Sequence, residues 1–216
     1  MPGMGGALRK AASVIAAREA DDGFEVLVLE RSAESRFLPG YIAFPGGAAE
    51  DGDAALAERW FGSAEEAARA CAVRELLEEV GLALTAEGVS SSQTRAIEVV
   101  ASAPPRAEQL SPIAHWIAPP DIPVRFDARY FAVEVTDGVE PHPDGVEAAR
   151  AWWMSPRALL QGWSDERHKL YWPTYFTMRA IAGCASVAEL LALRITTREP
   201  DEDELGRLPR STFWQA

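Results

Sequence analysis

The sequence has few cysteines, few basic residues and no long apolar run. Its two cysteines, Cys71 and Cys184, are too few for a disulfide framework, and no Cys/His spacing is typical of a zinc site. No run reaches membrane-spanning length, and no apolar core of a secretory signal follows Arg9 and Lys10. Because reduced thiols are the rule in the cytosol, we expect a cytoplasmic protein with no membrane partner.

Basic residues are outnumbered: 21 Lys and Arg stand against 33 Asp and Glu, for a formal net charge of -12. Such a chain lacks the basic surface that binds duplex nucleic acid, so we expect no partner of that kind. An anionic small molecule would be repelled at long range unless a metal ion or local arginines offset the charge. With 48% hydrophobic residues, the chain can bury one substantial core.

One predicted helix carries the most informative segment, Arg74–Leu82. Ser63 is a suitable N-cap, with Glu66 three residues later to close a capping box, and Gly81 supplies the stop. Val73, Leu76, Leu77 and Val80 fall on one side of this helix, which therefore faces the core.

Three carboxylates share the opposite face of the same helix. Glu75, Glu78 and Glu79 are neighbours in space, because residues three and four apart lie side by side on a helix. Like charges so placed repel one another, and a hard divalent cation such as Mg²⁺ or Mn²⁺ would offset the repulsion. The alternative interpretation is a solvated acidic face.

A glycine turn precedes the helix, and the two together resemble a known family. Phe44-Pro45-Gly46-Gly47 ends an apolar run and lets the backbone approach another group closely. From Glu66 onward the chain matches the fixed positions of the Nudix hydrolase signature, G-x(5)-E-x(7)-R-E-U-x-E-E-x-G-U, in which U is aliphatic. The resemblance implies an α/β fold, a Nudix-type α/β/α sandwich on a mixed sheet.

The chain departs from the signature at the first glycine. The residue six before Glu66 is Trp60, while the residue six after Gly47 is Asp53. Either Asp53 or Glu66 therefore fills the first acidic position. We expect an insertion at about residues 54–62, with a short helix at Ala54–Phe61, between the Gly-Gly turn and the catalytic helix.

The resemblance also implies a reaction, the hydrolysis of a pyrophosphate bond in a nucleoside diphosphate linked to another moiety. It assigns Glu75, Glu78 and Glu79 to Mg²⁺ or Mn²⁺, together with the carbonyl of Gly46, and makes Glu79 a candidate for activating water. Arg74 would hold a helix carboxylate in place. A second base often comes from a later loop, where the candidates are Glu134, Glu140 and Glu147.

A weaker resemblance extends upstream, to the coenzyme A and acyl-coenzyme A diphosphatase branch of the family. Its pattern R-S-x-x-L-R-x-H-x-G-x-x-x-F-P-G-G is similar to Arg31–Gly47, with departures at Ser35 and Leu38. This implies substrate binding by Arg31, Arg36 and Gly47, whereas in the alternative Arg36 is a surface residue of a loop and Arg31 caps a strand. Dinucleotides, nucleoside triphosphates and sugar nucleotides stay open as substrates.

The remaining elements complete one predicted domain at residues 1–195, with C-terminal helices at about 155–195 and a charged tail at 196–216. Strands are expected at Ala11–Ala17, Phe24–Arg31, Tyr41–Phe44, Ile113–Ile117, Arg129–Val135 and Ala151–Met154, and helices at Ser92–Ser102, Ser155–Leu160, Trp172–Ala182 and Ser186–Leu193. The segment Tyr171–Phe176 would line a substrate pocket or a subunit interface.

Two classes of function follow. The first is a metal-dependent enzyme acting on a small-molecule nucleotide, and the second is a Nudix-fold sensor that binds a nucleotide without cleaving it. Sensors of this kind typically lose helix carboxylates, and this chain keeps all three. A homodimer is compatible with the sequence, but no residue requires one. The preferred metal and the phosphorus that is attacked stay open.

Overall fold

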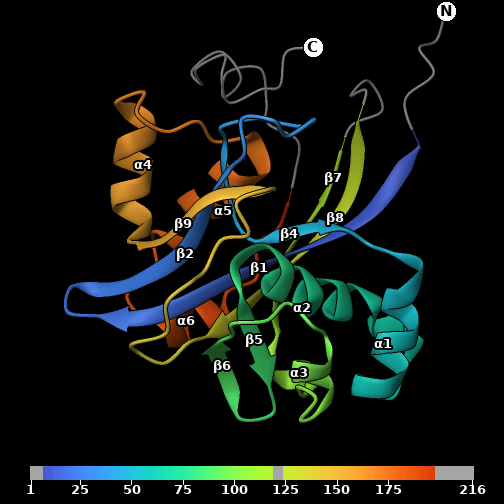
Figure 1. Ribbon diagram of the computed structural model, residues 1–216. Coiled ribbons are helices and arrows are strands. Elements are labelled where there is room, and N and C mark those ends of the chain that lie inside the picture. Colours follow the sequence, from blue (N-terminus) through green and yellow to red (C-terminus); the bar gives the residue numbers. More distant parts are fainter. Residues whose placement is uncertain (1–6, 119–123, 198–216) are drawn as a thin grey trace, which may run out of the picture.

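A mixed sheet of seven strands forms the centre of the computed structural model, which describes residues 7–118 and 124–197 (Figure 1). Its main path runs β3-β2-β1-β8-β7, while β4 pairs with β1 and β9 with β2. β1 is parallel to β8 and antiparallel to β2 and β4. The strands are β1 (Leu8–Ala20), β2 (Gly23–Arg31), β3 (Ile42–Ala43), β4 (Gly46–Ala48), β7 (Ser111–Ile117), β8 (Arg125–Glu134) and β9 (Ala148–Met154).

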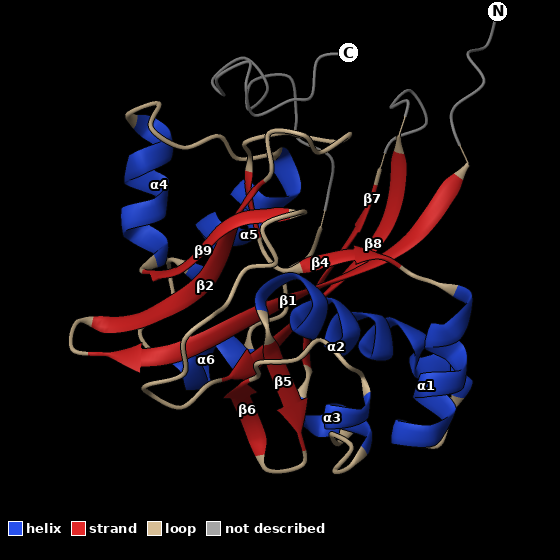
Figure 2. Cartoon of the chain, viewed as in Figure 1, coloured by secondary structure: helices blue, strands red, loops and turns tan. Residues whose placement is uncertain are grey.

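Helices cover both faces of this sheet (Figure 2). Successive side chains of a strand point to opposite faces, so Val14 of β1 packs in one cluster with α2 and Ile15 packs in the other with α5 and α6. The predicted α/β sandwich on a mixed sheet is therefore confirmed. The helices are α1 (Asp51–Phe61), α2 (Ala67–Val80), α3 (Glu98–Ala101), α4 (Pro156–Ser164), α5 (Trp172–Ile181) and α6 (Val187–Ala192), with 3₁₀ turns η1 (Ala64–Glu66) and η2 (Ala107–Gln109).

The insertion folds as predicted, into a helix between the glycine turn and α2. α1 ends at Gly62, whose φ of 74° is in the left-handed region that glycine adopts without strain. The predicted cap of α2 is wrong in detail. Ser63 caps the short η1 instead, by accepting the N–H of Glu65, and Glu66 pairs with Arg69 rather than closing a capping box. Gly81, with φ of 66°, ends α2 as expected.

One predicted helix is largely absent from the structure. Only Glu98–Ala101 of the expected Ser92–Ser102 is α-helical. The hydroxyls of Ser92 and Thr94 bond to nearby backbone groups, which competes with helical hydrogen bonds. A hairpin of β5 (Leu82–Thr85) and β6 (Gly88–Ser91) precedes this segment and was not predicted.

The C-terminal helices form where the sequence places them. Ser155 and Ser186 cap α4 and α6 through their side chains, and proline stands in the first turn of both α4 and α5. Among the described residues, no helix combines the length and apolar character needed to cross a membrane. Of the predicted tail at 196–216, residues 198–216 lie outside the part of the chain that the structure describes.

Candidate active site

α2 buries charged side chains as well as apolar ones. Val73, Leu76, Leu77 and Val80 are fully buried in the core, as the helical pattern predicts. On the other side of the helix, Arg74, Glu75 and Glu79 are exposed by only 6%, 8% and 3%. Charged groups are rarely buried so deeply unless they are paired. We call Arg74, Glu75, Glu78 and Glu79 the carboxylate face of α2.

Arg74 is the centre of a hydrogen-bond network on this face. Its Nε and Nη2 donate to the two carboxylate oxygens of Asp53, at 2.9 and 3.1 Å, in a bidentate pair. Its Nη1 donates to Glu75 and to Glu78, both at 2.9 Å. Burial alone would lower the pKa of Arg74, but these carboxylates raise it, so the guanidinium stays charged.

The same network includes one of the two candidates for the first acidic position. Asp53, in the first turn of α1, is 1% exposed and contacts Arg74. Glu66 is partly exposed and bonds to Arg69. The structure therefore brings Asp53 to the carboxylate face, and the insertion adds chain between Asp53 and α2 without moving Asp53 away from Arg74.

The glycine turn packs directly against two of the carboxylates. The N–H of Gly46 donates to Oε2 of Glu79 at 2.8 Å. A Cβ on Gly47 would lie 2.4 Å from Oε1 of Glu75, and a Cβ on Gly46 would lie 2.4 Å from the carbonyl oxygen of Ala12. Only glycine allows so close an approach of the backbone to its neighbours.

Burial changes the proton affinity of these carboxylates. It raises the pKa of Glu75 to about 7, against the opposing effect of Arg74. It raises the pKa of Glu79 to about 8, against the Gly46 hydrogen bond, and repulsion from Glu75 and Glu147 adds to the rise. A bound dication would favour the ionised forms of both carboxylates and would offset the repulsion between them.

The donor chemistry fits a hard cation, because the face offers carboxylate oxygens, and those of Glu75 and Glu79 are nearly buried. Within residues 7–118 and 124–197, however, no three acidic, histidine or cysteine side chains converge on one point as a metal cage. The reason is visible in the contacts. Arg74 draws Glu75 and Glu78 toward itself, and Gly46 holds Glu79.

Of the three candidate second bases, the structure brings one to the carboxylate face. Glu147 lies within electrostatic reach of both Glu75 and Glu79. Glu140 instead pairs with Arg18. Glu134 is exposed at the end of β8, opposite Ala17, and neither of these two lines the adjoining pocket.

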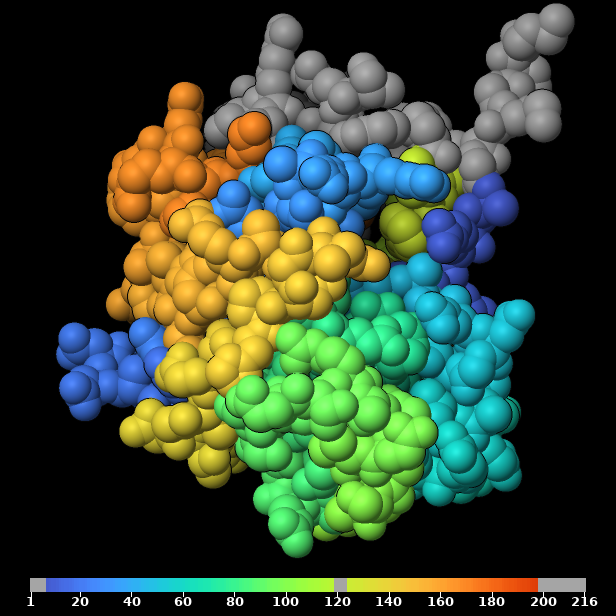
Figure 3. All heavy atoms as spheres, in the orientation of Figure 1, coloured from blue at the N-terminus to red at the C-terminus, as the bar shows by residue number. Residues whose placement is uncertain are grey.

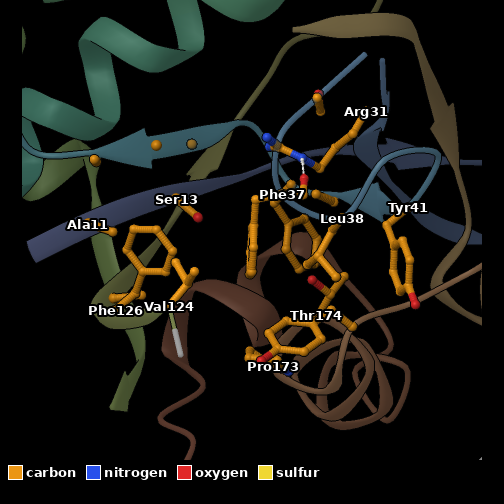
Figure 4. Close-up of a pocket in the computed structure, with 18 of the residues that line it drawn as sticks. Ala11, Ser13, Arg31, Phe37, Leu38, Tyr41, Val124, Phe126, Pro173 and Thr174 are labelled. Carbon is orange, nitrogen blue, oxygen red and sulfur yellow. Dashed lines mark hydrogen bonds between the residues drawn. The ribbon is translucent and has the colours of Figure 1, made fainter. Parts of the chain in front are cut away.

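A pocket of about 630 Å³ adjoins the glycine turn. Ala11 and Ser13 of β1, the loop between β2 and β3, Phe126 of β8 and the first turn of α5 surround it (Figure 4). Arg31, Arg36, Gly46, Gly47 and Glu147 all line it. The predicted substrate-binding residues therefore share one cavity with the candidate second base.

Aromatic rings contribute to the apolar wall of this pocket. Phe37 packs edge-on against Phe126 and Tyr171, at centroid distances of 5.7 and 5.9 Å. Arg31 donates from Nε to the carbonyl of Phe37 at 2.9 Å, which ties the loop to the end of β2 (Figure 4). Of the two interpretations of Tyr171–Phe176, the pocket is the one supported by the lining residues Tyr171, Trp172, Pro173 and Thr174.

Sequence reasoning missed a cluster of hydroxyls in the same pocket. Tyr130 is buried, which raises its pKa to about 12, and it hydrogen-bonds Ser13 and Thr174. These residues come from β8, β1 and α5. Only the tertiary structure brings them together, and no spacing in the sequence marks them.

Comparisons with known proteins agree with this arrangement. A family model described as the NUDIX domain matches residues 7–173. A putative nudix hydrolase 7 from Caenorhabditis elegans is 30% identical over 168 residues, which cover 70% of this chain and 53% of the relative. The chain thus spans about half the length of that curated relative.

Solved structures show the same fold. A NUDIX hydrolase from Alicyclobacillus acidocaldarius has a TM-score of 0.77 and 29% identity, with 89% of this chain and 99% of that chain covered. An Ap4A hydrolase from C. elegans has a TM-score of 0.50 and 15% identity, over 80% and 93% of the two chains. The matched family model, the relative and the geometry of the glycine turn and α2 together show that this chain belongs to the Nudix family.

Proposed function

We propose that this chain hydrolyses a pyrophosphate bond in a nucleoside-diphosphate-linked substrate, with Mg²⁺ or Mn²⁺ as cofactor. The observation that carries the proposal is the burial of Glu75 and Glu79 against Gly46 and Gly47. Both glutamates adjoin glycines that line the pocket, and buried carboxylates with raised pKa values beside a cavity are candidates for functional positions. Membership of the family supports this reaction class.

The metal ligands would be Glu75, Glu78 and Glu79, with the carbonyl of Gly46. When bound, the cation supplies positive charge that neutralises phosphate oxygens and favours ionised water. Arg74 holds Glu75 and Glu78 in fixed orientations through its Nη1. Glu79 and Glu147 are the candidates to accept the proton of the attacking water.

Substrate recognition is assigned to the pocket. Arg31 and Arg36 line it beside Gly47, so their guanidinium groups would bind the diphosphate oxygens and offset the acidic net charge of the protein. The aromatic wall beyond them would hold the uncharged part of the substrate. Coenzyme A or acyl-coenzyme A fits this proposal through the resemblance of Arg31–Gly47 to that branch.

The test is a hydrolysis screen of the purified protein with Mg²⁺ and with Mn²⁺. The panel contains coenzyme A, acyl-coenzyme A, dinucleotides, nucleoside triphosphates and sugar nucleotides. We expect metal-dependent release of two phosphorylated products from at least one of them. Thermal stabilisation by a nucleotide, with no hydrolysis in either metal, would instead favour the non-hydrolytic sensor.

A further inference from the structure

The loop that carries Glu147 is organised by one carboxylate. Oδ1 of Asp144 accepts the N–H groups of Val146, Glu147 and Ala148, at 3.1, 3.1 and 2.9 Å. Its Oδ2 accepts from Glu147 as well, at 3.2 Å. Gly145, at φ of 75°, makes the turn that brings these donors around the side chain.

The same loop is fixed to α2 through its backbone. The N–H of Asp144 donates to the carbonyl of Glu79 at 2.9 Å, and the N–H of His142 donates to the carbonyl of Val80 at 2.8 Å. These are carbonyls at the C-terminal end of α2, where no helical partner is left for them. Glu79 therefore contacts the loop through its carbonyl and the glycine turn through its side chain.

A second attachment joins the loop to the pocket. The carbonyl of Glu147 accepts the N–H of Ser32 at 2.8 Å, and Ala148 pairs with Arg31 across β9 and β2. In the space-filling view the yellow segment that contains this loop lies between the blue β2–β3 loop and the green segments below it (Figure 3). The Glu147 side chain thus projects from a backbone held on two sides.

We propose that Asp144 is a positioning residue that fixes Glu147 toward the carboxylate face of α2 and the pocket. This inference rests on the proposed function, because Glu147 acts as a base only if the site activates a water molecule for hydrolysis. The Asp144 side chain does not line the pocket, so it acts through Glu147 and not on the substrate. Without the acceptor oxygens, three backbone N–H groups lose their partners and the turn loses its single conformation.

The first experiment compares two substitutions of the same residue. Asp144→Ala removes all four hydrogen bonds, whereas Asp144→Asn keeps an oxygen in the place of Oδ1 and so retains three. We expect Asp144→Ala to lower kcat about tenfold or more, within the range of a misplaced general base, with KM changed little. Asp144→Asn should restore most of that loss.

A double-mutant cycle separates positioning from a merely structural role. In the Glu147→Gln background, Asp144→Ala should lower kcat less than about twofold, since residues that act through one group are not additive. Asp137→Ala is the matched control, because Asp137 is an exposed loop aspartate that bonds only to the N–H of its neighbour Gly138 among the contacts described. It should leave both kinetic constants unchanged.

The outcomes are distinct. If the wild type hydrolyses a substrate, the proposed function stands. Equal losses of kcat from Asp144→Ala in both backgrounds would then overturn the inference, as would an unchanged kcat in Glu147→Gln.

If the wild type hydrolyses nothing in the screen, the proposed function fails. Amide hydrogen exchange then still tests whether Asp144 organises the loop. Exchange at residues 146–148 should be faster in Asp144→Ala and near wild type in Asp144→Asn; equal protection in all three would refute the role.

Discussion

The two sides of strand β4 differ in the kind of interaction that fixes their side chains. On the α2 side, Arg74 bonds to Asp53, Glu75 and Glu78, and Glu79 accepts the N–H of Gly46, with hydrogen bonds 2.8 to 3.1 Å long. On the pocket side, aromatic rings and a loop with Leu38 at φ of 52° form the wall. Non-glycine residues rarely adopt such a φ.

This contrast predicts different roles for the two sides of β4. Charges that take part in a reaction need fixed positions, because misplacement costs rate steeply. A ring-lined pocket tolerates variation, because its contacts are individually weak and have no strict direction. Substitutions on the α2 side should therefore change kcat or stability, and those in the aromatic wall of the pocket should change KM.

The largest effect is expected from Glu79→Gln. The amide keeps an oxygen for the Gly46 N–H, but it neither accepts a proton nor carries charge. We expect kcat to fall about 10²- to 10⁴-fold, the range for a general base, while circular dichroism shows an unchanged fold. Glu134→Gln, at the exposed end of β8, is the control, and a similar fall in that variant would contradict the assignment.

Stability should respond most to Asp53→Ala. This change leaves the buried Arg74 without its bidentate partner, and breaking a buried pair costs about 3 to 5 kcal/mol. Since Arg74 keeps Glu75 and Glu78, we expect about 3 kcal/mol by urea unfolding. Glu66→Ala is the matched control on the partly exposed pair, where about 0 to 1 kcal/mol is the expected cost.

The close approach of the turn is tested by Gly47→Ala. The new Cβ would lie 2.4 Å from Oε1 of Glu75, so the carboxylate must move away from its bond to Arg74. We expect kcat to fall about 10- to 100-fold, as for a displacement of about 1 Å at an active site. Gly52→Ala, which meets nothing within 4 Å in α1, should leave kcat at the wild-type value.

The pocket side should give a different kinetic signature. Phe37→Ala removes a ring that packs against Phe126 and Tyr171. We expect KM to rise about tenfold with kcat nearly constant, which is the pattern of lost uniform binding. Phe61→Ala, on the far helix α1 beside Trp60, should not change KM. A fall in kcat without a change in KM would contradict the division between the two sides.

The last expected effect is a pH dependence of stability. The pKa of Glu79 is raised to about 8 in the folded state, so between about pH 4.5 and 8 the folded protein holds a proton that the unfolded chain has released. Stability therefore falls as pH rises through this window. The fall should be shallower in Glu79→Gln, measured by urea unfolding without metal, and Mn²⁺ should offset it in the wild type. Identical slopes would contradict the raised pKa.

The sequence predicted the parts of this molecule that depend on local pattern. The spacing of Glu75, Glu78 and Glu79 and the stop at Gly81 located α2 to within a few residues, and the insertion helix was recognised from the gap in the signature. The Ser92–Ser102 helix was wrong, because hydroxyls in that segment bond to the backbone instead.

The parts that depend on tertiary contact were not predictable. Asp53 and Glu66 are equivalent by spacing, and only the packing of α1 brings Asp53 to Arg74. Of the three candidate glutamates, only the placement of the loop brings Glu147 to the pocket and within electrostatic reach of Glu79. The hydroxyls of Ser13, Tyr130 and Thr174 lie together because β1, β8 and α5 each contribute one of them to the pocket. No local pattern in the sequence predicts this meeting of three separate elements.

The most direct test of the central claim is a crystal of this protein grown or soaked with Mn²⁺, with the anomalous signal of manganese recorded. We expect a manganese peak bound by carboxylates of Glu75, Glu78 and Glu79 beside the Gly46 carbonyl, with the Arg74–Asp53 pair retained. A crystal in which Mn²⁺ binds elsewhere would contradict this metal site. So would a crystal in which these carboxylates remain hydrogen-bonded to Arg74 and Gly46 at saturating Mn²⁺.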